Sequence, residues 1–297
     1  MLAVLAVLAF WKFEAVSSCV LKARKFIGCQ YHIWKSHRLQ ADISKLQPLT
    51  ANGGEWYAKY HFIAHNGGII EGRLHTGSKE AWQHSYERGV RIIDADYEFT
   101  SDNHGVIRHG WSQNLEQGNE PNPMTLDGFT STPINYKYHA LTVEDMIDFM
   151  LSHKDVYIAV DAKHDAVKVF DSLVQTAKKM NTEEIFSRVI VSLDDTNDVE
   201  RVKDVYPFKN FALRQYGFSH NWYKLAEFCI KNDIHAVNIF DYVLNADPEG
   251  VKILTSKGIH VFVAVVNSLR QLQGYKDLGV TGAVSDYLSE SDWELLQ

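Results

Sequence analysis

The sequence has few cysteines, no excess of positive charge and no hydrophobic run long enough for a clear transmembrane helix. Its three cysteines, Cys19, Cys29 and Cys229, form no C-x-x-C pair, which argues against a disulfide framework and a structural zinc site. We expect them to be small buried apolar residues. The chain has 30 Lys and Arg against 37 Asp and Glu, a formal charge of -7. No nucleic-acid partner is expected, because the whole-protein basic footprint is missing.

The overall composition is that of a soluble globular protein. Of the 297 residues, 45% are hydrophobic, 23% charged and 12% aromatic, which excludes a disordered, collagen-like or coiled-coil chain. The stretch Leu46 to Trp56 contains Pro48, Asn52, Gly53 and Gly54, which are turn and linker residues. No internal repeat is present. We therefore predict an N-terminal segment, residues 1–50, and a single domain, residues 51–297.

The N-terminal segment combines an apolar stretch with basic residues. Met1 to Trp11 is uninterrupted apolar sequence, shorter than the ~20 residues that span a bilayer. No basic residue precedes it, and the charged residues Lys12 and Glu14 come directly after it, which disfavours a cleaved secretory signal. From Lys12 to Arg38, apolar and basic residues interleave, as in a helix on an anionic membrane surface. A helix packed on the adjoining domain fits the pattern equally, so localisation stays open.

Short apolar or β-branched runs alternate with helix-like stretches through the rest of the chain, the pattern of βαβ units and a parallel sheet. Eight strands close a TIM (β/α)8 barrel, so we predict this α/β fold. The predicted strands are Tyr60–Ala64, Val90–Tyr97, Val156–Asp161, Arg188–Leu193, Asn210–Leu213, His235–Ile239, His260–Val266 and Thr281–Ser285. The predicted helices are Ser78–Arg88, Thr142–His153, Ala166–Met180, Val199–Val205, Trp222–Asn232, Pro248–Ser256 and Ser268–Leu278.

One further run, Val106 to His109, comes after the second strand and a short turn. The turn is too short for the crossover that a parallel strand requires. We therefore predict an extra antiparallel strand outside the barrel. Gly110 to Ala140 contains three prolines with several Gly and Asn, so we predict a long loop insertion over one barrel face. Loops of that length are usually functional or disordered.

Polar residues gather where the predicted strands end, and in such barrels active sites lie at these C-terminal ends. Residues i and i+2 of a strand point to the same face. Asp94 therefore projects with Asp96, and Asp161 with Lys163. The polar strand-end sequences are His65-Asn66-Gly67-Gly68, Asp94-Ala95-Asp96, His109-Gly110 and Asp161-Ala162-Lys163.

These residue types suit metal-assisted acid–base chemistry. Carboxylates at the positions of Asp94, Asp96 and Asp161 favour Mg²⁺ or Ca²⁺ over zinc and leave positions for water or a substrate phosphate. The alternative is that Asp94 and Asp96 are satisfied by backbone amides. A pair of histidines can divide deprotonation of a nucleophile and protonation of a leaving oxygen, and our candidates are His65 and His109. The other histidines receive no role, with His164 held in reserve.

Taken in order, these motifs resemble the glycerophosphodiester phosphodiesterase family, within the superfamily of phosphoinositide-specific phospholipase C-like phosphodiesterases. The similarity runs from Phe62 to Leu288. It rests on Ile63-Ala64-His65-Asn66-Gly67-Gly68, Asp94-Ala95-Asp96, Val106-Ile107-Arg108-His109, Asp161-Ala162-Lys163, Val265-Val266-Asn267 and Leu278 to Asp286. The resemblance implies His65 and His109 as general acid and base, and Lys163 as a phosphate-holding residue. It implies Asp94, Asp96 and Asp161 as metal ligands.

Several positions depart from the family pattern. The family typically has Arg where this chain has Asn66, usually Glu at Asp94, and often Glu at Asp161. It also has Asp where Gly110 stands and Trp at Ala264. Shorter carboxylates change the metal's surroundings, and loss of the Arg removes a bidentate phosphate clamp.

Two related families share part of the pattern. His-Asn with a later carboxylate-x-Asp pair is similar to phosphoinositide-specific phospholipase C, which implies Asn66 as a fourth metal ligand. Spider-type sphingomyelinase D enzymes resemble the chain at His109-Gly110 and Asp161-x-Lys163, but their cysteine-bridged loop has no counterpart here.

The leading hypothesis is metal-dependent hydrolysis of a phosphodiester, with a glycerophosphodiester as the favoured substrate, either a small molecule or linked to a lipid. One alternative is phospholipase C-like cleavage of a phospholipid. The other is a catalytically inactive barrel that binds a phosphorylated lipid or polysaccharide.

Overall fold

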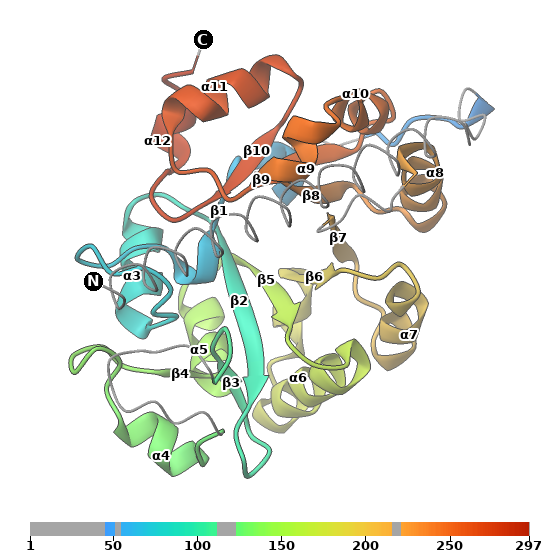
Figure 1. Cartoon of the computed structure of the whole chain (residues 1–297). Helices are drawn as coiled ribbons and strands as arrows, with labels where there is room; N and C mark the ends of the chain where they lie inside the picture. Colours follow the sequence, from blue (N-terminus) through green and yellow to red (C-terminus); the bar gives the residue numbers. More distant parts are fainter. Residues whose placement is uncertain (1–44, 51–54, 112–122, 216–220, 297) are drawn as a thin grey trace, which may run out of the picture.

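The computed structural model describes residues 45–50, 55–111, 123–215 and 221–296. In this part of the chain, eight parallel strands close into a barrel in the order β1-β2-β5-β6-β7-β8-β9-β10, with β10 pairing back to β1 (Figure 1). This confirms the predicted (β/α)8 fold. The ring strands are β1 (Phe62–Ala64), β2 (Ile92–Phe99), β5 (Tyr157–Ala162), β6 (Val189–Leu193), β7 (Asn210–Gln215), β8 (Ala236–Phe240), β9 (His260–Ala264) and β10 (Gly282–Ser285).

Helices follow the ring strands and surround the barrel (Figure 1). The seven predicted helices are confirmed, with ends that differ by one residue at most. They are α3 (Lys79–Glu87), α5 (Val143–Ser152), α6 (Ala166–Met180), α7 (Asp198–Val205), α8 (Trp222–Asn232), α10 (Glu249–Thr255) and α11 (Leu269–Asp277). Sequence analysis missed the shorter elements α2 (Trp56–Lys59), η2 (His65–Gly67), α4 (Leu126–Ser131), η3 (Glu183–Ser187), α9 (Asp241–Ala246) and α12 (Glu290–Trp293).

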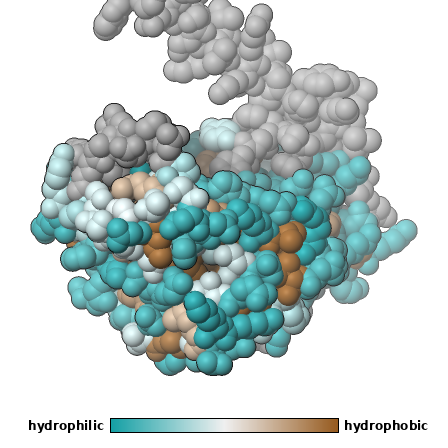
Figure 2. All heavy atoms as spheres, turned by 90° about the horizontal axis from the view of Figure 1, so that it is seen from below, coloured by the Kyte–Doolittle hydropathy of each residue, from teal (hydrophilic) through white to brown (hydrophobic). Residues whose placement is uncertain are grey.

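The predicted apolar and basic N-terminal segment, with Cys19 and Cys29, lies outside the described residues. The division at residue 50 stays a prediction, because residues 51–54 are also outside them. Cys229 is fully buried, as expected. Within the described residues, no helix has both the length and the hydropathy needed to cross a bilayer. The face in Figure 2 is mainly hydrophilic, with hydrophobic residues in small separate patches.

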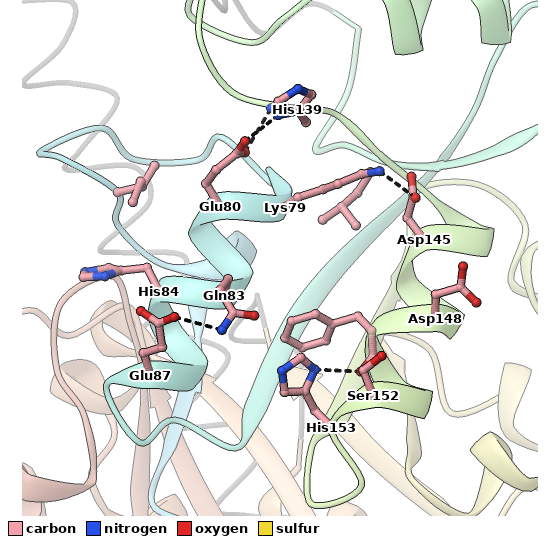
Figure 3. Close-up of a pocket in the computed structure, with 13 residues that line it drawn as sticks. Lys79, Glu80, Gln83, His84, Glu87, His139, Asp145, Asp148, Ser152 and His153 are labelled. Atoms are coloured by element: carbon pink, nitrogen blue, oxygen red, sulfur yellow. Dashed lines mark hydrogen bonds and ion pairs between the residues drawn. The ribbon is translucent and has the colours of Figure 1, made fainter.

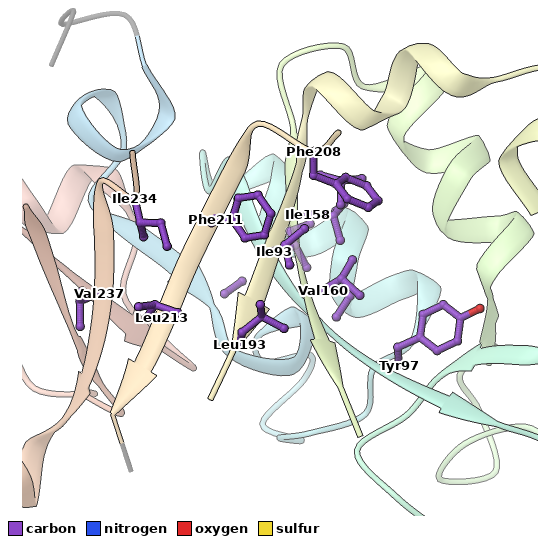
Figure 4. Packing of buried hydrophobic residues seen from close by; sticks show 14 of the residues in the cluster. Ile93, Tyr97, Ile158, Val160, Leu193, Phe208, Phe211, Leu213, Ile234 and Val237 are labelled. Carbon is purple, nitrogen blue, oxygen red and sulfur yellow. The ribbon is translucent and has the colours of Figure 1, made fainter. Parts of the chain in front are cut away.

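Alternation along the strands decides which side chains face the helices and which face the barrel interior. Ile93 and Tyr97 of β2 and Ile158 of β5 belong to the hydrophobic layer between strands and helices (Figure 4). Asp94 and Asp96, which alternate with Ile93, Ala95 and Tyr97, therefore point inward. The parallel register of β2 and β5 places Asp96 beside Asp161. Two inward carboxylates from neighbouring strands thus meet at one level of the barrel.

A short helix closes the barrel at the end where the strands begin. Trp56 of α2 is 1% exposed and belongs to the interior cluster. Its ring stacks on Phe262, with ring centroids 6.2 Å apart. Tyr57 stacks on His235, just before β8. The described chain begins at this end, because the Leu49 N–H donates to the Lys257 carbonyl, 2.9 Å away and shortly before β9.

We expect Trp56→Ala to lower the free energy of unfolding by about 3–5 kcal/mol, because the substitution leaves a cavity at the bottom of the barrel. Urea denaturation monitored by circular dichroism measures this. Tyr136→Ala is the matched control, since Tyr136 is 74% exposed and its loss should change stability by no more than about 0.5 kcal/mol. Equal stability of the two variants would contradict the closing role of α2.

Two strands lie outside the ring. β3 (Gly105–Ile107) pairs antiparallel with β2, and β4 (Leu141–Thr142) pairs antiparallel with β3. This confirms the predicted extra strand, although β4 was missed.

The insertion after β3 was predicted as a long loop. The structure shows that it also contains a short helix, α4. The Thr125 hydroxyl accepts the Gly128 N–H at the start of that helix, and Phe129 is buried. Phe129 and Trp111 belong to a separate hydrophobic cluster that packs the insertion together. Residues 112–122 of the insertion lie outside the described part of the chain.

Candidate active site

A cavity of about 230 Å³ opens at the ends of the ring strands where the predicted polar residues lie. Six of the seven predicted site residues line it, and Asn66 does not. The polar lining residues are His65, Asp94, Asp96, His109, Asp161, Lys163, Arg214 and Asn238. A cavity at this end of the strands, with several converging polar groups, is the usual place for a TIM-barrel active site.

Three carboxylates, those of Asp94, Asp96 and Asp161, lie close together in the lining of the cavity. One oxygen each of Asp94, Asp96 and Asp161 lies within 4.8 Å of the other two. Asp96 and Asp161 are 1% and 3% exposed. Lys163 Nζ lies 2.6 Å from Asp96 Oδ1 and 2.6 Å from Asp161 Oδ2. Arg214 also pairs with Asp161 Oδ2 and donates to Asp194.

The carboxylates have unequal affinities for protons. Burial, together with the charge of Asp161, raises the pKa of Asp94. Burial and the charge of Asp94 raise the pKa of Asp96 to about 7. Burial also acts to raise the pKa of Asp161, but the charge and hydrogen bond of Arg214 outweigh it and hold this pKa at about 2. Mutual repulsion among buried carboxylates is relieved when a cation lies between them.

These residues fit a hard divalent cation. Asp96 Oδ2 and Asp161 Oδ1 are buried and have no hydrogen-bond partner among the described residues. Buried carboxylate oxygens normally find a partner, so the two oxygens are available to a ligand. An all-oxygen donor set favours Mg²⁺ or Ca²⁺ over softer metals.

His65 is held by a carboxylate that sequence analysis did not assign to the site. His65 Nδ1 lies 2.9 Å from Asp286 Oδ1. Asn267 donates from Nδ2 to Asp286 Oδ2 over 2.6 Å, and Asn267 Oδ1 accepts the Asp286 N–H. Burial acts to lower the pKa of His65, but the Asp286 bond and the charge of Asp94 outweigh it, so the pKa is raised. Asp286 therefore fixes the ring and stabilises its protonated form.

His109 lines the same cavity and is exposed to solvent. Burial of part of the ring lowers its pKa, and the charges of Lys163 and His65 add to this against the opposite effect of Asp96. The two histidines thus differ in their preference for the proton. This is the asymmetry that an acid and a base working together require.

Asn66 belongs to a tight turn beside the cavity. Asn66, Gly67 and Gly68 have φ values of 44°, 82° and 82°, and Asn and Gly tolerate this left-handed conformation best. The turn lets the Asn66 N–H donate to Asp94 Oδ2 over 3.3 Å. The side-chain amide is buried against Gly77 and has no hydrogen-bond partner among the described residues. The role of Asn66 as a metal ligand stays a prediction.

Arg214, Asn238 and Asp286 were not among the predicted site residues. Arg214 is the penultimate residue of β7, Asn238 lies in the middle of β8, and Asp286 directly follows β10. Like Asp161, Arg214 and Asp286 stand at the C-terminal ends of ring strands, and this position is the sequence signal that could have identified them.

A larger surface cavity of about 570 Å³ lies between α3 and α5, outside the barrel (Figure 3). Its charged residues are largely paired with one another. Lys79 Nζ lies 2.6 Å from Asp145 Oδ1, and Glu80 accepts hydrogen bonds from His139. None of the predicted site residues lines this cavity, so its size does not make it the candidate active site.

Fold and cavity together define a TIM-barrel protein with a carboxylate and histidine site at the C-terminal ends of its strands. Neither protein-family models nor curated protein sequences match the chain. Solved structures do match it. A glycerophosphodiester phosphodiesterase from Parabacteroides distasonis has a TM-score of 0.64 at 19% identity, over 80% of this chain and 96% of that one.

Two further structures give the same result. One from Thermotoga maritima, a glycerophosphodiester phosphodiesterase, has a TM-score of 0.59 at 15% identity, covering 80% of this chain and 97% of that one. An Oleispira antarctica phosphodiesterase in complex with the product sn-glycerol-3-phosphate has a TM-score of 0.62 at 15% identity, covering 78% and 95%. At this identity the likeness establishes the fold, which is the fold that the sequence motifs implied.

Proposed function

We propose that this protein is a metal-dependent phosphodiesterase that hydrolyses glycerophosphodiesters. The observation that carries the proposal is the cavity itself, in which three carboxylates, two histidines, a lysine and an arginine converge at the active end of the barrel. The shared fold with glycerophosphodiester phosphodiesterases supports it. An inactive binding barrel has less support, because a mere phosphate-binding site needs neither a buried carboxylate cluster nor two histidines.

The anionic substrate binds in the cavity where Lys163 and Arg214 lie in contact with the carboxylate cluster. Asp94, Asp96 and Asp161 would hold Mg²⁺ or Ca²⁺, which when bound would neutralise phosphate charge and lower the pKa of a hydroxyl beside it. Lys163 and Arg214 face the same cavity and stabilise charge on the phosphoryl oxygens. The family that this chain resembles typically has a phosphate-binding Arg at the position of Asn66. In this chain Arg214 supplies a guanidinium to the cavity instead.

Proton transfer is divided between the two histidines. His65, fixed by Asp286, and His109 serve one attacking and one leaving oxygen, one as proton acceptor and the other as donor. If a substrate hydroxyl attacks, a cyclic phosphate forms and the alcohol leaves. Water then opens the ring with the two roles exchanged.

Cavity size favours a small substrate. A volume of about 230 Å³ is below the roughly 300–1,000 Å³ of sites for drug-sized ligands. A glycerol phosphate with a small head group fits this scale better than a diacyl phospholipid does. The product sn-glycerol-3-phosphate, present in the Oleispira antarctica structure, is the product expected here.

Hydrolysis of a substrate panel tests the proposal. We expect metal-dependent release of glycerol phosphate from glycerophosphocholine, glycerophosphoethanolamine or glycerophosphoinositol, and at least tenfold slower turnover of phosphatidylinositol. The assay compares Mg²⁺, Ca²⁺ and a chelator and identifies the products by mass spectrometry. Faster turnover of phosphatidylinositol would favour the phospholipase C-like alternative. Binding of these compounds without turnover would favour the inactive barrel.

A further inference from the structure

A second group of metal-ligating side chains joins His65, which lines the cavity, to His75 and Asp286, which do not line it. One ligand atom each of His65, His75 and Asp286 lies within 4.8 Å of the other two. The two histidine rings meet edge to face, with centroids 4.8 Å apart. This group offers two nitrogen donors and one oxygen donor, whereas Asp94, Asp96 and Asp161 offer oxygen alone.

His75 lies in the segment between β1 and α3 with a left-handed backbone, φ 56°, a conformation in which His, Asn and Asp are enriched among non-glycine residues. Its Nδ1 is buried and has no hydrogen-bond partner among the described residues. Burial and the charge of His65 lower the pKa of His75. The buried, unpartnered Nδ1 is a candidate donor to a metal.

We propose that His65, His75 and Asp286 bind Zn²⁺, and that this binding inhibits hydrolysis. Two imidazoles and a carboxylate are a ligand set that favours zinc over Mg²⁺ or Ca²⁺. Zinc bonds of about 2.0–2.2 Å place neighbouring ligand atoms about 3.3–3.5 Å apart in a tetrahedron. His65 Nδ1 and Asp286 Oδ1 are already 2.9 Å apart, so the main change needed is an approach of His75 by no more than about 1.5 Å. Asn267 already holds Asp286 in place.

The inhibition results from the double use of His65. A ring nitrogen that binds Zn²⁺ cannot also hold a proton, so His65 loses the exchange between its neutral and doubly protonated forms. The catalytic histidine pair is then incomplete. The inhibition rests on the proposed function, whereas the binding of zinc does not.

Zinc binding is measured by competition with a chromophoric chelator at saturating Mg²⁺. We expect the wild type to bind one zinc ion that His75→Asn binds at least tenfold more weakly. Asn suits the left-handed backbone at this position, and His75→Gly provides a second variant if the first does not fold. His139→Asn is the control, because it removes an exposed histidine that pairs with Glu80, and it should bind zinc like the wild type. Equal binding by wild type and both His75 variants would overturn the site.

Inhibition is measured in the hydrolysis assay with the same proteins. We expect micromolar Zn²⁺ to suppress turnover by the wild type and His139→Asn. At least tenfold more Zn²⁺ should be needed to halve the rate of His75→Asn, with each rate compared with that of the same protein without zinc. If zinc binding depends on His75 but zinc does not change the hydrolysis rate, then His65 is not both a zinc ligand and a catalytic residue, and the proposed inhibition is overturned. Absence of any turnover without zinc would contradict the proposed function, while the binding measurement would still decide the site.

Discussion

His65→Ala and His109→Ala should each lower kcat for hydrolysis of a glycerophosphodiester by about 10²–10⁴-fold, the usual contribution of a general acid or base. Both side chains line the cavity. Neither belongs to the hydrophobic clusters of the barrel, so the fold should be unaffected. Initial rates at saturating substrate, with circular dichroism as a check on folding, measure the effect.

A phosphodiester with a nitrophenol leaving group separates the two roles. Nitrophenolate leaves without assistance, so the variant that lacks the proton donor should recover much of its rate on this substrate. The variant that lacks the proton acceptor should not. Asp286→Asn should show a smaller loss than His65→Ala, because it removes the partner of the ring but leaves the ring itself. The control is His104→Ala, an exposed histidine outside the cavity. Wild-type rates in either alanine variant would contradict the histidine pair.

Asp96→Asn should abolish metal-dependent hydrolysis, lowering kcat/KM by about 10³-fold. The substitution removes a charge from the centre of the carboxylate cluster, where Asp96 has one unpartnered buried oxygen. A bound metal stabilises the charge of the transition state by several kcal/mol. Each 1.36 kcal/mol of this stabilisation that is lost lowers the rate about tenfold. A chelator should reduce the wild type to the same level.

Calorimetric titration with Mg²⁺ and with Ca²⁺ provides a readout that does not depend on turnover. We expect Asp96→Asn to bind either ion at least tenfold more weakly than the wild type. Asp171→Asn is the matched control, since Asp171 is exposed on α6 and accepts a hydrogen bond from Gln175. An Asp96→Asn variant that hydrolyses the substrate in the presence of chelator would exclude the carboxylate cluster as a metal site.

The barrel could be predicted from the sequence because its signals are local and repeated. Each ring strand is a short apolar run, and the helices between them begin and end with recognisable residues. Ser78, for example, caps α3 by accepting the Ala81 N–H. Alternation along β2 and β5 was sufficient to place Asp94 with Asp96 and Asp161 with Lys163.

The missed elements depend on tertiary contacts. The four residues of α2 are held by packing of Trp56 inside the barrel. A helix that short has no periodic pattern of apolar residues from which it could be predicted. The six residues of α4 include Gly128, a poor helix former, and Phe129, whose burial against Trp111 is invisible in the sequence. His75 stands in a turn with no strand or helix period, so only the folded chain shows that it meets His65.

The hydrogen bond between Leu49 and Lys257 fixes the direction from which the described chain reaches the barrel. It lies at the end where the strands begin, and the cavity opens at the end where they finish. An attachment at Leu46 would therefore lie at the opposite end of the barrel from the reactive groups.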